Sequence, residues 1–226
     1  MKKVIGITKD QYSEWIIKKH YAHRLPCVEH AFGLYIDNVI SGVCTFGPPA
    51  RQMNNGESVF NKYRVKTFEL NRLVIKEKMP KDSLSFFVAE ALSLLPKPCC
   101  VVSYADATFG HKGYIYQATN WIYTGLNQVD ERKIIGADGK DIHPRTAWEL
   151  AKKAGYSNTS DWVDSSKEVK HGEYTEKHRY FMFLGDKRQK KIMKKDLIYR
   201  QFPYPKGDTI RYKIDDEQIS SQQFLF

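Results

Sequence analysis

One stretch near the middle of the chain gathers side chains that could do chemistry. Residues 104–125 read YADATFGHKGYIYQATNWIYTG and include six aromatic residues. Asp106 ends a run that is otherwise apolar, and Tyr116 follows within a predicted short helix. A carboxylate can orient an amine or a cation, and a phenol can transfer a proton. The stretch therefore predicts a substrate site in addition to packing.

Glycines and further aromatic residues in the same stretch leave more than one interpretation open. Gly110 and Gly113 stand at the start of the predicted helix, where backbone amides can approach an anionic ligand, although ordinary turns show the same spacing. Aromatic faces beside basic residues can hold unstacked bases. We expect Trp121 and Tyr123 to pack in the core and Tyr116 to point at a site.

A second polar residue lies inside a predicted strand. The segment TFELNRLVIK, residues 67–76, alternates so that Arg72 should share a face with Phe68 and Leu70. A buried guanidinium needs a partner or a cleft, because burying an unpaired charge is costly. We expect Asp106 to be that partner, either in a salt bridge that only locks the sheet or in a clamp for an anion or a nucleobase.

A histidine-rich segment follows the first predicted helix. Residues 20–30 read HYAHRLPCVEH, whose spacing permits metal ligation but matches no standard zinc pattern, so no metal site is assigned. His20 and Tyr21 are candidates for a general base and a proton donor. Ser85 lies in the first turn of a later predicted helix, where a hydroxyl either caps the backbone or contacts a phosphate.

The chain is strongly basic. Of its 226 residues, 36 are Lys or Arg and 26 are Asp or Glu, which gives a formal net charge of +10. This charge favours a polyanionic partner, above all nucleic acid, although a merely solvated basic surface is the alternative. The densest positive region is DKRQKKIMKKDLIYR, residues 186–200, which suits contacts with phosphates.

The cellular setting follows from other features. The four cysteines show no metal-binding spacing and are typical of free, buried thiols in a reducing compartment. No apolar stretch is long enough to cross a bilayer. We expect a cytoplasmic protein with no membrane contact.

The predicted elements that must position these residues alternate along the chain. Helices are expected over 8–20, 82–95 and 111–119, and strands over 31–47 (a hairpin turning at Asp37 and Asn38), 67–76, 99–106, 121–123 and 179–185. Ligands bind beyond the carboxyl ends of strands joined by a helical crossover. This order predicts an α+β fold with a mixed central sheet flanked by helices.

The composition becomes polar and charged from residue 127 onward. We therefore divide the chain into a core of residues 1–126, an insertion or lid of residues 127–176, and a closing strand with the basic C-terminal segment over 177–226. Residues 144–155 predict a small amphipathic helix within the insertion, which could enter a DNA groove or rest as a lid.

Several segments together resemble the bacteriophage Mom family of DNA-modification proteins, and they span most of the chain. They are HYAHRLP (20–26), FELNRLVI (68–75), SLSFFVAEAL (83–92), the stretch 104–125 and HRYFMFLGDKRQKK (178–191). The resemblance implies a fold like that of GCN5-related N-acetyltransferases. It also implies an enzyme that converts adenine in double-stranded DNA to its N6-carbamoylmethyl form, which protects phage DNA from host restriction.

Matching the family's motifs residue by residue gives six expected site residues. They are His20, Tyr21, Arg72, Ser85, Asp106 and Tyr116. The resemblance leaves the cofactor open, with acetyl-CoA or another activated donor as candidates and an iron requirement as a further option. The segment KEKMPKDSLS, residues 76–85, contains no glycine, whereas acetyltransferases use a glycine-rich turn here to hold the coenzyme A pyrophosphate. That departure argues against acetyl-CoA held in the usual way.

Two other functions compete with DNA modification. One is an N-acyltransferase that acts on a protein or small-molecule amine, against which the net charge and the missing glycine turn argue. The other is a non-catalytic nucleic-acid-binding module, against which the buried polar residues argue. The oligomeric state is open, with a homodimer as one option.

Overall fold

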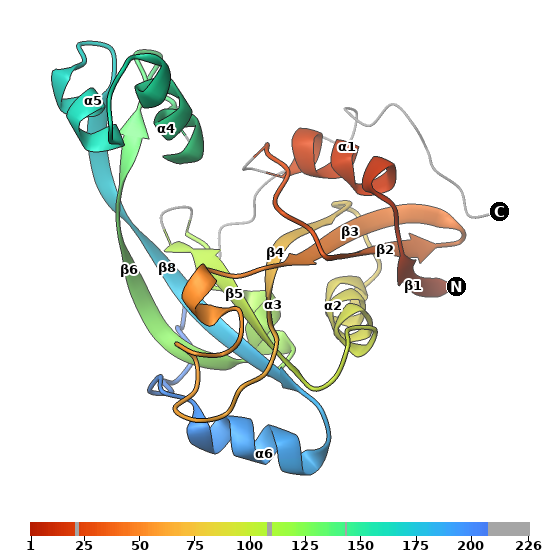
Figure 1. The fold of residues 1–226 in the computed structure, drawn as a ribbon. Helices are drawn as coiled ribbons and strands as arrows, with labels where there is room; N and C mark the ends of the chain where they lie inside the picture. The colour runs from red at the N-terminus through yellow and green to blue at the C-terminus, as the bar shows by residue number, and fades with distance from the viewer. Residues whose placement is uncertain (21–22, 108–109, 143, 208–226) are drawn as a thin grey trace.

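A mixed sheet with helices on both faces forms the body of the protein (Figure 1). The computed structural model describes residues 1–20, 23–107, 110–142 and 144–207. Within these residues the sheet has eight strands in the order β1-β2-β3-β4-β5-β8-β6-β7. The strands are β1 (Lys2–Gly6), β2 (His30–Ile36), β3 (Val39–Gly47), β4 (Thr67–Ile75), β5 (Cys99–Asp106), β6 (Ile122–Ile135), β7 (Asp141–Ile142) and β8 (Lys170–Leu184).

Six α-helices accompany the sheet within the described residues. They are α1 (Lys9–Lys19), α2 (Ser83–Ser93), α3 (Tyr114–Ala118), α4 (Pro144–Lys153), α5 (Thr159–Ser165) and α6 (Lys187–Asp196). None of the helices in the described part of the chain is long and apolar enough to span a bilayer. The predicted α+β class with a mixed sheet flanked by helices is confirmed.

The first four strands form an antiparallel half of the sheet. The hairpin between β2 and β3 turns at Asp37 and Asn38, whose φ angles are 48° and 65°. Asn and Asp tolerate this left-handed conformation better than most residues, which explains why the turn could be predicted. The edge strand β1 was not predicted, because five residues give little periodicity.

The two halves of the sheet meet at a short parallel pairing that then opens. Strand β4 pairs with β5 only over Thr67–Glu69 and Cys100–Val102. Beyond this point β4 continues beside β3, while β5 continues beside β8. The two central strands therefore diverge, and we call the point of divergence the fork. Helix α2 connects them, as predicted, by lying between them in sequence and packing on the sheet.

An irregularity in β4 changes which residues share a face. The register with β3 shifts between Thr45, which lies opposite Arg72, and Phe46, which lies opposite Leu70. Asn71 is thus an extra residue, and such a bulge reverses the alternation beyond it. The prediction that Arg72 shares a face with Phe68 and Leu70 is therefore wrong.

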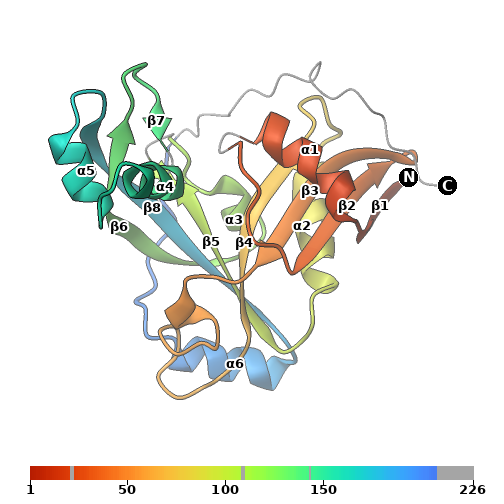
Figure 2. The ribbon, with the colours of Figure 1, turned by 45° about the horizontal axis from the view of Figure 1, so that its top comes forward.

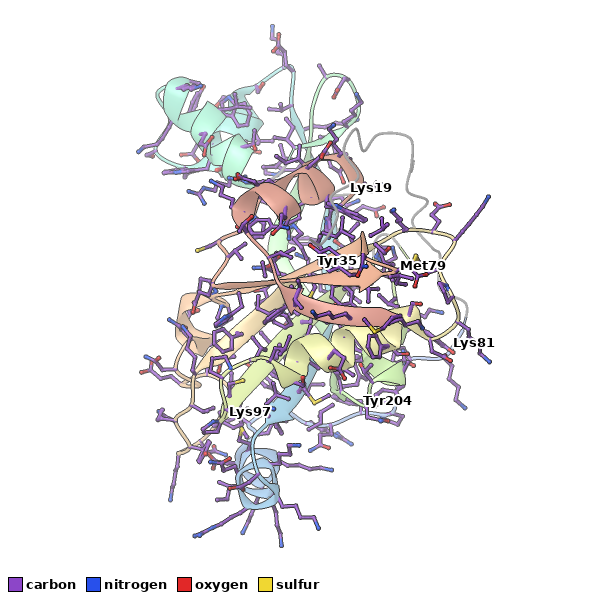
Figure 3. All side chains as sticks on the ribbon, turned by 90° about the vertical axis from the view of Figure 1, so that its right-hand side faces the viewer. Lys19, Tyr35, Met79, Lys81, Lys97 and Tyr204 are labelled. Atoms are coloured by element: carbon purple, nitrogen blue, oxygen red, sulfur yellow. The ribbon has the colours of Figure 1, made fainter. Side chains whose placement is uncertain are left out.

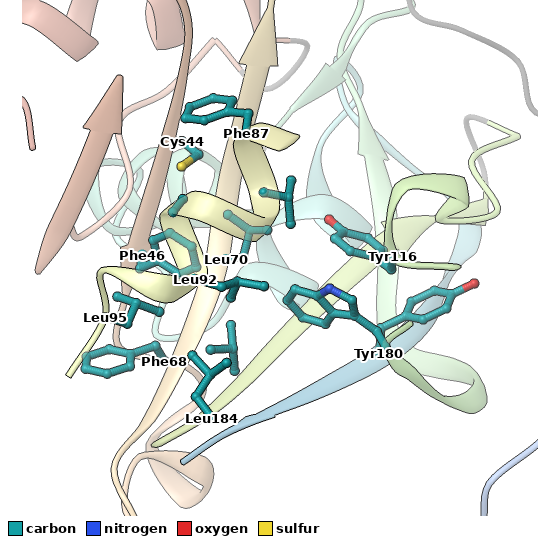
Figure 4. Packing of buried hydrophobic residues seen from close by; sticks show 14 of the residues in the cluster. Cys44, Phe46, Phe68, Leu70, Phe87, Leu92, Leu95, Tyr116, Tyr180 and Leu184 are labelled. Carbon is teal, nitrogen blue, oxygen red and sulfur yellow. The ribbon is translucent and has the colours of Figure 1, made fainter. Parts of the chain in front are cut away.

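Hydrophobic clusters fix the helices on the two faces. On one face, α2 and α3 cover a large cluster that includes Phe68, Leu70, Phe87 and Tyr116 (Figure 4). On the other face, α1 covers a second cluster through Trp15 and Ile16. A third cluster, which includes Met193 of α6, lies on the same face as α1 but over β5 and β8. The four cysteines are free, and all except the exposed Cys27 are buried.

Strands β6 and β8 extend beyond the body as a long two-stranded arm that carries β7, α4 and α5 at its tip (Figures 1 and 2). The tip has its own small core of Ile134, Ala147 and Val163. Residues 127 and 177 lie opposite each other in the arm ladder, so the boundaries of the predicted insertion fall at one level of the arm. The predicted helix over 144–155 corresponds to α4, and α5 was not predicted.

The packing of α2 on the sheet gives a test of the fold. Phe87 is 0% exposed in the large cluster, so Phe87→Ala should lower the free energy of unfolding by about 3–5 kcal/mol. Leu94, which directly follows the helix, is 49% exposed, and Leu94→Ala should change stability by only about 0.5 kcal/mol. Urea denaturation of both variants measures the difference. Similar losses would contradict the described burial.

Candidate active site

The fork is the centre of the candidate site, and a serine spans it. Ser103 of β5 is fully buried, and its hydroxyl bridges the carbonyl oxygen of Leu70 on β4 at 2.8 Å and the hydroxyl of Tyr116 at 2.7 Å. Leu70 follows the last residue of β4 that pairs with β5, and Ser103 supplies a donor for its buried carbonyl oxygen. Ser103 therefore joins the diverging strands and places the Tyr116 hydroxyl between them.

Tyr116 is held from several sides. Its ring lies 5.1 Å from that of Tyr180 and 5.0 Å from that of Trp121, measured between centroids, and the side chain is only 8% exposed (Figure 4). Gly113 precedes α3 with φ +67°, and a Cβ there would come within 2.5 Å of the Tyr180 ring. This position thus requires glycine, and the close contact fixes the start of α3.

The C-terminal segment fastens α3 from outside. The hydroxyl of Tyr204 donates to the carbonyl oxygen of Trp121 at 2.7 Å, and Lys112 Nζ donates to the carbonyl oxygen of Lys206 at 2.9 Å. Tyr180 donates to the carbonyl oxygen of Lys112 at 2.5 Å. The aromatic residues of the motif thus build a rigid support, and Trp121 and Tyr123 lie in the core as predicted.

Arg72 lies on the other face of β4, toward the segment that follows α1. Its Nε and Nη2 each donate to the carbonyl oxygen of Arg24 at 3.3 Å, and Nη1 donates to that of Asn71 at 2.7 Å. Asn71 in turn donates to the carbonyl oxygen of Cys27 at 3.0 Å. These described bonds of Arg72 go to backbone carbonyls, so one of its roles is to hold the segment after α1 against the sheet.

His20 caps the C-terminal end of α1 beside Arg72. The imidazole is 8% exposed, and burial, followed by the charges of Arg72, His23 and His111, lowers the pKa of His20 to about 3. His20 is therefore neutral at physiological pH, and one ring nitrogen can accept a hydrogen bond or a proton.

Asp106 completes a chain of electrostatic neighbours across the fork. It lies opposite Lys177 in the β5–β8 ladder, and the backbone amide of His111 donates to its carbonyl oxygen at 3.1 Å. Burial lowers the pKa of His111, and the charge of Asp106 partly opposes this shift. The charge of His111 also contributes to the lowered pKa of His20.

Glu69 was not among the predicted site residues. It is the last residue of β4 that pairs with β5, and the bulge puts it on the same face as Arg72. Burial raises the pKa of the Glu69 carboxyl, while Lys177 and Arg72 partly offset the shift. A charged residue inside an apolar strand was the available signal for it, and the assumed alternation placed it away from Arg72.

Ser85 lies apart from the fork. Its hydroxyl donates to the carbonyl oxygen of Asp82 at 3.1 Å, a local bond at the start of α2. It lines a groove of about 640 Å³ between α2 and the end of α3, together with Lys97, Asn120 and Lys190. Tyr21, the remaining expected site residue, lies outside the described residues. The structure thus brings His20 beside Arg72 on the α1 face of β4, holds Tyr116 against Ser103 on the opposite face, places Asp106 at the end of β5 and sets Ser85 elsewhere.

The residues that the structure describes contain no group of three or more His, Cys, Asp or Glu side chains able to hold a metal ion. The described carboxyl and imidazole groups near the fork are close to the positive charges of Arg72 and Lys177, and these charges oppose the binding of a metal cation. The described site therefore does not fit the iron requirement that the resemblance left open.

Comparisons with known proteins place the chain among enzymes of the transferase type. A family model described as the Mom protein family matches residues 3–206, so the chain belongs to the Mom protein family. A curated relative, the methylcarbamoylase mom of Escherichia phage Mu, is 28% identical over 196 residues, which cover 83% of this chain and 77% of the relative.

Solved structures that resemble the chain are acetyltransferases. One is a GNAT family acetyltransferase from Bacillus cereus ATCC 10987, with 11% identity, a TM-score of 0.41 and coverage of 81% of this chain and 97% of that chain. Another is a GNAT family acetyltransferase from Elizabethkingia anophelis with acetyl-CoA bound, with 11% identity, a TM-score of 0.40 and coverage of 81% and 98%.

The buried, neutral His20 generates a prediction about acid stability. Its pKa in the folded state, about 3, lies below the unfolded value of 6.5, so its contribution to stability is present above pH 6.5 and is lost as the pH falls toward 3. Between pH 6.5 and 4.5 the wild type should lose about 2–3 kcal/mol from this group. His20→Gln should lack this component. Urea denaturation across this range tests it, and parallel profiles would contradict it.

Proposed function

We propose that this protein modifies adenine in double-stranded DNA and installs the N6-carbamoylmethyl group, which protects phage DNA from host restriction. Membership of the Mom protein family supports this proposal, as does the similarity to the methylcarbamoylase mom of phage Mu. The observation that carries it is the fork, where Ser103 holds the hydroxyl of Tyr116 and where buried polar groups, His20 and Glu69, lie on the other face of β4, which core packing alone does not need.

The chemistry of adenine explains why such a site is useful. The lone pair of the exocyclic amine is delocalised into the ring, so the amine must be oriented and deprotonated while it attacks an activated carbon. A base stacked in a duplex must also be turned outward to reach a pocket. In the transfer, a bond forms between N6 and the incoming carbon, the bond from that carbon to its leaving group breaks, and N6 loses one proton.

The residues around the fork divide these tasks in our proposal. Tyr116 gives a proton to the leaving group, and Asp106 orients the exocyclic amine. His20 is neutral and receives the proton from N6, with Glu69 as a second acceptor because burial raises the pKa of its carboxyl. Arg72 stabilises negative charge that develops in the transition state. Tyr21 is retained as a proton donor on the resemblance alone.

The groove between α2 and α3 holds the anionic part of the donor in this proposal, and the reactive carbon of the donor reaches the fork. Lys97 and Lys190 line the groove and favour an anionic donor, and Ser85 offers a hydroxyl at its rim. Acetyl-CoA or another activated donor fits this description. The absence of glycine in residues 76–85 remains at odds with the usual pyrophosphate turn.

The proposal also includes the domain organisation and the cellular location of the protein. Residues 127–176 form an insertion beside the core of residues 1–126, and residues 177–226 supply the closing strand and the basic segment. The DNA substrate places the protein in the cytoplasm of the host cell.

Nucleoside analysis tests the proposed function directly. DNA from cells that express the protein is digested to nucleosides and examined by mass spectrometry, with DNA from cells that lack the gene as the control. The expected result is a new deoxyadenosine adduct whose mass corresponds to a carbamoylmethyl group. Unmodified DNA together with a newly acylated protein or small amine would favour an N-acyltransferase instead.

Point variants at the fork test the assigned roles. Tyr116→Phe and Asp106→Asn should each lower the yield of adduct by about 100-fold or more, because a group that moves or orients the proton is removed. The matched control is Tyr114→Phe, since Tyr114 lies on the same short helix and is 70% exposed. It should keep full activity. Normal adduct yield in the two fork variants, with circular dichroism as the check of folding, would remove them from the mechanism.

A further inference from the structure

Helix α6 carries an unusual density of positive charge on a firmly attached element. Six of its ten residues are Lys or Arg, and all six side chains are exposed, whereas Met193 is buried in the cluster with Val59 and Phe60. A capping box formed by Asp186 and Gln189 starts the helix. The helix therefore presents its charges from a fixed position.

These charges are not neutralised within the described part of the protein. None of the six cations forms a salt bridge or a side-chain hydrogen bond with a described residue. The two acidic residues that bound the helix bind backbone amides instead: Asp186 accepts from Gln189 at 2.7 Å, and Asp196 accepts from Lys62 at 2.8 Å and Tyr63 at 2.6 Å.

Like charges on this helix also repel one another. Lys187 and Lys191, Lys190 and Lys194, and Lys191 and Lys195 each stand four residues apart, and every such pair costs about 0.2–0.5 kcal/mol. Lys62 adds a further positive charge, because it lines a shallow groove of about 360 Å³ together with Lys195. This repulsion lowers the stability of the free protein, and a surface with so much unneutralised positive charge is complementary to a polyanion.

The position of α6 separates it from the fork. Helix α6 lies at one end of the molecule, whereas α1 and the tip of the arm lie toward the other end (Figures 1 and 2). In the view of Figure 3 the side chains of α6 spread outward from that end, away from the rest of the protein. A duplex that presents a base to the fork therefore leaves α6 free for another stretch of nucleic acid.

We propose that the exposed face of α6, formed by Lys187, Arg188, Lys191, Lys194 and Lys195, binds the phosphate backbone of a second segment of double-stranded DNA together with the neighbouring Lys62. The inference rests on the proposed function for the choice of DNA as the polyanion. A ten-residue helix is about 15 Å long and lies along about nine phosphate charges of a duplex. Contacts of this kind give affinity without sequence preference.

The second segment has a consequence for modification of long DNA. While α6 holds one part of a DNA molecule, nearby bases of the same molecule stay at a high effective concentration around the fork. A short duplex that fills only the fork gains nothing from α6. The length of the DNA is therefore the variable that separates this role from a general effect of charge.

The test compares two variants with the same change of net charge. The first combines Lys187→Gln, Lys191→Gln, Lys194→Gln and Lys195→Gln, which removes repulsion and keeps good helix formers. The control combines Lys3→Gln, Lys9→Gln, Lys18→Gln and Lys78→Gln, all at exposed positions away from α6 and from the arm. Circular dichroism should show both to be folded.

Binding and bridging are the primary readouts. For long duplex DNA, the slope of log K against log salt should become shallower by about 3–4 in the α6 variant, since about 0.9 is lost per phosphate contact. Wild type should also retain a labelled duplex on beads that carry a second, immobilised duplex, and the α6 variant should retain at least tenfold less. The control variant should behave like the wild type in both assays.

Activity provides the second readout. The α6 variant should modify long DNA at least tenfold more slowly at limiting protein, yet modify a short duplex at the wild-type rate when protein is saturating.

Bridging that survives in the α6 variant, an equal loss in the control, or a loss of short-duplex activity would each overturn the proposal. The proposal would also be overturned if the α6 variant bound DNA as the wild type does but had lost binding to RNA or to vesicles of phosphatidylcholine and phosphatidylserine at 3:1. Bridging of two duplexes does not require catalysis. If the protein bridges DNA but no adenine adduct is found, the proposed function is refuted and the role of α6 is not.

Discussion

The fork between β4 and β5 is the constraint on which the candidate site depends. The two strands pair over only three residues each, because β4 stays beside β3 while β5 follows β8. Leu70 directly follows the last residue of β4 that pairs with β5, and the hydroxyl of Ser103 on β5 donates to its carbonyl oxygen. The same hydroxyl positions Tyr116. One buried hydrogen-bonding requirement thus determines where the phenol of α3 can lie.

The bulge at Asn71 supplies the polar side of the fork. Without the extra residue, Arg72 would point into the apolar cluster under α2, where a guanidinium is costly. With it, Arg72 and Glu69 face the same side as α1, and Arg72 reaches the carbonyl oxygen of Arg24. Burial keeps His20 neutral and raises the pKa of Glu69, so the protein maintains polar groups there at some cost to stability. Such a cost is typical of a site rather than of a core.

Much of the fold was predictable because local signals agreed with the global arrangement. The turn at Asp37 and Asn38, the capped α1 and the apolar β5 each carry a pattern within a few residues. The bulge does not, since it depends on how β3 and β4 fit together, and this is why the face of β4 that carries Arg72 was mispredicted and Glu69 was overlooked. Ser103 was passed over as a site residue for a related reason: a serine in a strand has no distinctive pattern until its neighbour across the fork is known.

The positive charge of the chain is unevenly divided between the arm and the rest of the protein. Residues 127–176 contain eight Lys or Arg and ten Asp or Glu, so the arm is slightly acidic although the whole chain carries +10. The excess of positive charge therefore belongs to the body and to the segment after β8. At the arm tip, exposed cations lie over aromatic rings, as Lys152 does over the ring of Trp148. Under the proposed function, long-range attraction of DNA therefore comes from the body and α6, and the arm contributes only short-range contacts.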